Sequence, residues 1–163
     1  MMTQEKRGYM LRENEGQAYW FLNALVLTKA SSGQSENAFA LQVITATRGQ
    51  EPPRHIHYHQ DEWFYIIEGT MSIHCGDDTW HAESGAFVCM PRGVPHSFTI
   101  ESEQLKMLVI TSPGGPKGFD AFVQELGRPA EQLTLPEPEK PDLQRLRQIA
   151  QKYDIEILPP AAY

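Results

Sequence analysis

The apolar positions along this chain predict many short β-strands. Residues 24–30 (ALVLTKA) and 39–47 (FALQVITAT) are rich in β-branched residues, and the turn-prone segment SSGQSEN separates them. Further strand-like runs follow at close spacing, over residues 62–68, 70–75, 79–83, 86–90, 96–101 and 104–111. Most of the breaks between these runs contain glycine. Short strands joined by tight glycine-containing turns indicate an all-β sandwich or barrel.

The pattern changes after the segment PGGP at residues 113–116. Residues 117–127 place apolar side chains at helical spacing and end on a glycine, so they predict a short helix. A proline-rich acidic connector follows, and Asp142 is placed to cap a second helix over 143–153.

These patterns divide the chain into two predicted parts. Residues 1–116 form a β-barrel that includes the N-terminal strands. Residues 117–163 form a helical and extended tail, which packs on the barrel or on a partner subunit.

Length, charge and the distribution of apolar residues limit the classes of protein to which this chain can belong. The 163 residues suffice for one domain with a full core. A net charge of −7, without a dense basic patch, argues against nucleic-acid binding. No apolar run reaches the roughly 20 residues of a membrane helix. The first residues do not resemble a signal peptide, which favours a cytoplasmic protein. Cys75 and Cys89 are therefore expected to be buried free thiols.

The segment RHIHYHQDEWFY, residues 54–65, contains three of the six histidines. In a strand, His55 and His57 point to the same face, whereas His59 joins them only if the extended conformation continues. A bend before Glu62 can return its carboxylate towards the same interior. Imidazoles with one carboxylate suit zinc, iron, nickel, cobalt, manganese or copper. The alternative is a solvated, histidine-rich edge strand.

A second segment, GAFVCMPRGVPH at residues 85–96, combines a glycine turn, a strand, a Pro-x-Gly turn and a histidine. Together the two segments resemble the motifs of the cupin superfamily. The first motif, G(X)5HXH(X)4E(X)6G, fits Gly49, His55, His57, Glu62 and Gly69. The second, G(X)5PXG(X)2H(X)3N, fits Gly85, Pro91, Gly93 and His96, with Ile100 at the place of the final asparagine.

The resemblance implies a fold and a metal site. The fold would be a cupin, a jelly-roll-like β-barrel, here with a short C-terminal helical extension. The ligands of one divalent transition metal (Ni, Fe, Mn, Co, Zn or Cu) would be His55, His57, Glu62 and His96. On an octahedral ion they leave two positions, which suffice for water and a substrate oxygen, or for substrate and dioxygen.

Strand alternation extends the prediction to the surroundings of the metal. Four apolar residues should share the inward face of the ligands, namely Phe64, Ile66, Phe98 and Ile100. They predict either a pocket for a flat or apolar organic molecule, or ordinary core packing. Trp63, Tyr65 and Ile67 should face outward, which suits a homodimer or a second sheet layer.

Finer sequence features favour one group within the superfamily. The run DEWFYIIEGTMSI and the C-terminal KYDIEILPP resemble single-domain cupins grouped with quercetin 2,3-dioxygenases. This resemblance implies a metal-dependent dioxygenase that cleaves an aromatic or enolic small molecule, with Glu62 as the catalytic base. The alternatives are a non-catalytic small-molecule-binding or sensor cupin, and a metal-dependent isomerase or decarboxylase.

Overall fold

The computed structural model describes residues 7–160, which form strands and two helices. The strands are β1 (Gln17–Phe21), β2 (Ala24–Ala30), β3 (Ala40–Thr47), β4 (His55–His57), β5 (Asp61–Glu68), β6 (Thr70–Cys75), β7 (Asp78–Glu83), β8 (Phe87–Met90), β9 (His96–Ile100), β10 (Gln104–Ser112), β11 (Arg128–Pro129) and β12 (Ile155–Ile157). The helices are α1 (Phe119–Leu126) and α2 (Leu143–Lys152).

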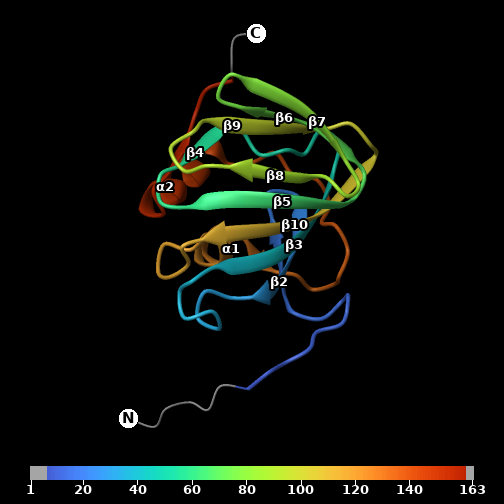
Figure 1. Ribbon diagram of the computed structural model, residues 1–163, viewed down its shortest axis with the longest axis vertical. Coiled ribbons are helices and arrows are strands. Elements are labelled where there is room, and N and C mark those ends of the chain that lie inside the picture. Colours follow the sequence, from blue (N-terminus) through green and yellow to red (C-terminus); the bar gives the residue numbers. More distant parts are fainter. Residues whose placement is uncertain (1–6, 161–163) are drawn as a thin grey trace.

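The strands form two antiparallel sheets that face each other (Figure 1). One sheet has the order β11-β1-β2-β3-β10-β5-β8, and the other has the order β12-β4-β9-β6-β7. The predicted all-β, jelly-roll-like fold is confirmed. The barrel consists of two facing sheets and not of one sheet that closes on itself.

Alternating burial along the strands places the core between the two sheets. In β10 every second residue from Leu105 onwards is buried, and β5 buries Glu62, Phe64 and Ile66 in the same way. Side chains on one face of a strand recur every second residue, so this pattern gives each sheet one apolar inner face. Tyr65 is 46% exposed on the opposite face of β5, as expected.

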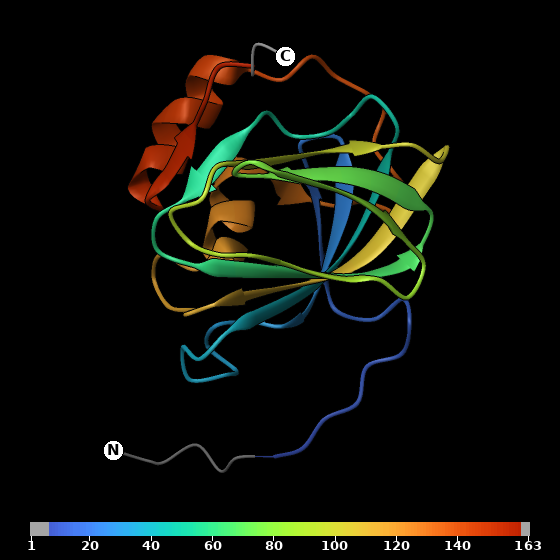
Figure 2. The ribbon, with the colours of Figure 1, turned by 45° about the horizontal axis from the view of Figure 1, so that its top comes forward.

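Both predicted helices are present at one end of the sandwich (Figure 2). The carboxylate of Asp142 accepts a hydrogen bond from the backbone N–H of Arg145 at 2.9 Å, so Asp142 is the expected cap of α2. The tail also supplies two strands that the sequence analysis did not predict. Strand β11 pairs with β1, and β12 pairs with β4.

The division into a barrel and a tail stays a prediction, and its residues 1–6 and 161–163 lie outside the described part of the chain. Neither of the two helices within residues 7–160 has the length and apolar character to span a bilayer.

Both cysteines are free, as expected, but only Cys75 is buried. The prediction that Cys89 is buried is wrong, because its position in β8 faces outward.

Candidate metal centre

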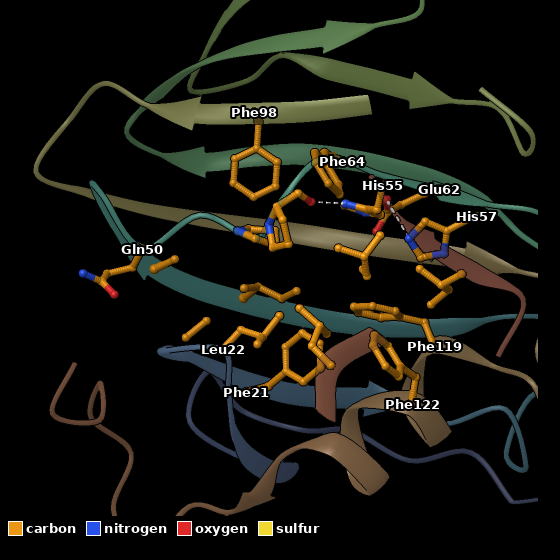
Figure 3. A pocket seen from close by; sticks show the side chains of 18 of the residues that line it. Phe21, Leu22, Gln50, His55, His57, Glu62, Phe64, Phe98, Phe119 and Phe122 are labelled. Carbon is orange, nitrogen blue, oxygen red and sulfur yellow. Dashed lines mark hydrogen bonds and ion pairs between the residues drawn. The ribbon is translucent and has the colours of Figure 1, made fainter. Parts of the chain in front are cut away.

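Four side chains from three strands meet between the two sheets. His55 and His57 lie on β4, Glu62 lies near the start of β5, and His96 begins β9. One ligand atom from each lies within 4.8 Å of the others. His57, Glu62 and His96 are at most 4% exposed. Figure 3 shows His55, His57 and Glu62 together at one end of a pocket.

Sheet pairing explains why these residues meet. His55 and His96 are direct partners across the β4–β9 pair, so their side chains leave the sheet side by side. The backbone N–H of Gly93 donates to the carbonyl of His57 at 2.8 Å, which joins the turn before β9 to the histidine strand. Glu62 approaches from the opposite sheet. Its Oε2 lies 3.2 Å from Nε2 of His96 and 3.8 Å from Nε2 of His57.

Backbone carbonyls orient two of the three imidazoles. Nδ1 of His55 lies 2.8 Å from the carbonyl oxygen of Pro53, and Nδ1 of His96 lies 3.0 Å from that of Val94. Each Nδ1 therefore carries a proton, and this N–H donates a hydrogen bond to the carbonyl oxygen. In a neutral ring the lone pair of Nε2 is then free. Nδ1 of His57 is buried and has no hydrogen-bond partner among the described residues.

Burial and mutual charge determine the protonation states in the metal-free chain. Burial, followed by the neighbouring imidazoles, lowers the pKa of His55 to about 3, and burial also lowers the pKa of His57. Burial alone would raise the pKa of Glu62, but the three imidazoles together lower it to about 2. Burial opposes protonation of His96, but the hydrogen bond and charge of Glu62 raise its pKa overall. At neutral pH the centre thus contains an ionised carboxylate and at least two neutral imidazoles.

This donor set fits a divalent transition metal. Metal ligation requires neutral imidazole nitrogens and an ionised carboxylate, and both are present in this largely buried cluster. Nδ1 of His57 has no such carbonyl partner, so no hydrogen bond among the described residues fixes the tautomer of this ring. His59 is half-buried and lies outside the four-residue cluster.

An apolar cavity of about 70 Å³ adjoins the cluster. Phe64 and Phe98 line it, and their rings meet edge to face at 5.8 Å. Ile66 and Ile100 point inward as expected, but they are fully buried in the core and absent from the cavity lining, so for these two the structure matches the alternative of ordinary core packing. Alternation places both on the inward face. However, Ile66 lies four residues after Glu62 and Ile100 four residues after His96, which is about 13 Å along each strand.

The wall opposite Phe64 and Phe98 comes from parts of the chain that the sequence analysis did not connect with the site. The β1–β2 hairpin and the tail supply Phe21, Leu22, Phe119, Phe122, Leu146, Ile155 and Ile157. The ring of Phe119 lies 5.9 Å from that of His57. Gln50 lies at the far end of the pocket, with its amide pointing away from the cluster (Figure 3). The apolar stripes of the two predicted helices were the available signals for this wall.

Comparisons with known proteins agree with the motifs. A sequence model described as a cupin domain matches residues 42–111. Quercetin 2,3-dioxygenase from Bacillus subtilis is 24% identical over 113 residues, which cover 69% of this chain. An uncharacterised protein from Streptomyces coelicolor is 35% identical over 79 residues, which cover 48% of this chain and 70% of that protein.

Solved structures show the same fold. The cupin domain of Cnp3 from Schizosaccharomyces pombe superposes with a TM-score of 0.51 at 18% identity, over 56% of this chain and 65% of that chain. The match to the Bacillus subtilis dioxygenase covers 34% of that protein, so this chain spans about a third of its length. The family model ends before the tail, so the wall built from α1, α2 and β12 lies outside the matched segment.

Proposed function

This chain belongs to the cupin superfamily, and we propose that it is a metal-dependent dioxygenase that acts on an enolic or aromatic small molecule. The observation that carries the proposal is the His-His-Glu-His cluster beside an almost entirely apolar cavity. In this proposal His55, His57, Glu62 and His96 hold one divalent transition metal, which can be nickel, iron, manganese, cobalt, zinc or copper. The bound metal would supply Lewis-acid activation of a substrate oxygen and the redox chemistry of dioxygen.

Glu62 is the proposed catalytic base. Its carboxylate is ionised in the metal-free chain and lines the cavity, so the carboxylate can take the proton of an enolic hydroxyl bound there. Loss of that proton converts the substrate into an enolate. The aromatic rings of Phe64 and Phe98 would hold a flat substrate beside the cluster and exclude water from it.

The size of the cavity favours a small substrate. Pockets that enclose drug-sized molecules usually occupy about 300–1,000 Å³, whereas this cavity has about 70 Å³. A short enol or a molecule with one small ring therefore suits this conformation better than a flavonol. A flavonol would require the wall made by Phe119 and Phe122 to move.

Oxygen consumption by the metal-loaded protein tests this proposal. The purified chain is loaded separately with each candidate metal, its metal content is measured, and enols of increasing size, from β-diketones to flavonols, are added in air. We expect oxygen uptake that depends on the metal and is fastest with the smaller enols. Full metal occupancy without oxygen uptake across the panel would contradict the dioxygenase proposal.

The small apolar cavity is also compatible with a second function, that of a non-catalytic ligand-binding or sensor protein. In that case a small enol would raise the Tm of the metal-loaded protein without being consumed. A third function, a metal-dependent isomerase or decarboxylase, would give product in the complete absence of oxygen. Measuring turnover with and without oxygen, together with ligand-induced stabilisation, separates all three.

The outer face of the large sheet supports a further proposal, that the chain forms a homodimer. Tyr65 and Phe87 are cross-strand partners and are 46% and 64% exposed, so they form an apolar pair on the surface. Sedimentation velocity at several concentrations measures the oligomeric state. The cytoplasmic location of the protein stays a prediction.

A further inference from the structure

Thr111 is a buried residue whose hydroxyl has no partner. It lies on β10 directly opposite Glu62 of β5 and is 1% exposed. Its Oγ1 makes no hydrogen bond to any described residue. Nearly all buried polar groups in folded proteins are hydrogen-bonded, and a hydroxyl left without a partner lowers stability. Thr111 therefore requires an explanation, and its position beside a candidate ligand suggests one.

Sheet geometry places the Thr111 hydroxyl within reach of the Glu62 carboxylate. Both side chains point to the inner face, because β10 buries Met107, Val109 and Thr111 while β5 buries Glu62 and Phe64. The Cβ atoms of directly opposed residues in an antiparallel pair lie about 4.5–5.5 Å apart. From that separation a hydroxyl can reach a carboxylate directly or through a single water molecule.

The carboxylate loses a donor when the imidazoles act as ligands. In the metal-free chain Nε2 of His96 lies 3.2 Å from Oε2 of Glu62. The carbonyl of Val94 keeps one proton on Nδ1, so Nε2 can donate to Glu62 only in the doubly protonated ring. A ring that offers its Nε2 lone pair to a metal has no proton there. The Glu62 carboxylate then requires another hydrogen-bond donor, because ligating carboxylates are generally hydrogen-bonded.

We propose that Thr111 is the positioning residue for Glu62, and that its hydroxyl donates to the Glu62 carboxylate, directly or through one water, when the centre holds its metal. This inference rests on the proposed metal centre. The hydroxyl fixes the rotation of the carboxyl group and thereby determines which oxygen faces the metal and the substrate. Thr111 itself does not touch the metal or the reacting atoms.

Cobalt binding by Thr111 variants tests the proposal, because Co²⁺ reports the geometry of its ligands in its visible spectrum. Thr111→Val removes the hydroxyl and keeps the shape. We expect it to bind Co²⁺ about tenfold more weakly and to shift the cobalt absorption bands. Thr111→Ser keeps the hydroxyl and should restore both the affinity and the spectrum. In the metal-free protein, Thr111→Val should keep or raise the Tm, because it removes an unpaired buried hydroxyl.

Thr28→Val is the matched control. Thr28 is also buried, at 5% exposure, but its hydroxyl accepts a hydrogen bond from Nε2 of Gln42 at 3.1 Å. This variant should lower the Tm and leave Co²⁺ affinity and spectrum unchanged.

Three results would overturn the inference. The first is that the unsubstituted protein binds Co²⁺ well and Thr111→Val binds it with the same affinity and spectrum. This result would exclude the role of Thr111 and leave the proposed metal centre intact. A lower Tm of metal-free Thr111→Val would show that the hydroxyl is already bonded elsewhere. Failure of the unsubstituted protein to bind Co²⁺ would overturn the metal centre together with the inference.

Discussion

Ile155 of β12 lies directly opposite His57 of β4, so a residue of the C-terminal tail is in register with a candidate metal ligand. Strand β4 pairs with β12 at three positions, whereas it pairs with β9 at the single position His55–His96. The tail therefore supplies most of the pairing that holds the histidine strand in place. It also contributes the side chain of Ile155 to the cavity wall.

Shortening Ile155 should weaken metal binding as well as the fold. Ile155 is 5% exposed, so Ile155→Ala should lower the free energy of unfolding by about 2–5 kcal/mol and lower Co²⁺ affinity because β4 loses its support. Ile73→Ala, a fully buried core variant outside the cavity lining, is the control. Ile73→Ala should lower the free energy of unfolding by a similar amount but leave the Co²⁺ affinity unchanged. Equal losses of affinity in both variants would refute a specific role of the tail.

The four-residue cluster predicts different effects for a histidine inside it and a histidine outside it. His96→Ala should reduce metal occupancy to a small fraction of that of the unsubstituted chain, because it removes one of four donors. His59→Ala should keep full occupancy, because His59 lies outside the cluster. Metal analysis after dialysis measures both. Loss of metal from His59→Ala would show that the ligand set is wrong.

Glu62→Gln separates proton transfer from metal binding. The amide oxygen can still face the metal, but the side chain cannot accept a proton at neutral pH. We expect most of the metal to be retained and turnover to fall by at least about 100-fold, the usual contribution of a general base. Glu68→Gln, at the exposed end of β5, should have no effect on turnover. Unchanged activity of Glu62→Gln with bound metal would exclude Glu62 as the base.

Acidification should destabilise the metal-free protein. The pKa of His55 is about 3 in the folded chain, against 6.5 for an exposed histidine. Between these two values the unfolded chain binds a proton that the folded chain does not, so stability falls as the pH falls. The lowered pKa of Glu62 adds a loss between pH 4.5 and about 2. The raised pKa of His96 acts in the opposite direction and offsets part of the first loss.

Melting curves in the presence of a chelator check this pH dependence. We expect a lower Tm at about pH 5 than at neutral pH, and a smaller difference in His55→Asn, which cannot titrate. His59→Gln, the control, should keep the full difference. A Tm that rises on acidification would contradict the predicted protonation states.

Truncating Phe119 should broaden the range of substrates. Phe119 is 7% exposed, begins α1 and lines the cavity, so Phe119→Ala should enlarge the cavity at a cost of about 3–5 kcal/mol in stability. Under the proposed function, oxygen uptake with larger enols should rise relative to that with small ones. Phe87→Ala, on the outer face, should leave this ratio unchanged. An unchanged ratio in Phe119→Ala would show that Phe119 does not limit substrate size.

The local features of this protein were readable from the sequence. The run ALVLTKA became β2 at Ala24–Ala30, and Asp142 caps α2, because β-branching and side-chain capping act over a few residues. The resemblance to the cupin motifs implied that His55, His57, Glu62 and His96 meet, and the structure brings them together. Alternation correctly separated Phe64 from the outward Tyr65.

Only the tertiary structure decided what surrounds the cluster. A strand of three residues such as β12 is too short to show a periodic pattern, so its pairing with β4 was not predictable. The position of Thr111 opposite Glu62 depends on the register between two strands some fifty residues apart in the chain, and this register results from packing of the whole core. The cavity size follows in the same way from tail residues such as Phe119, which reach the site only through long-range contacts.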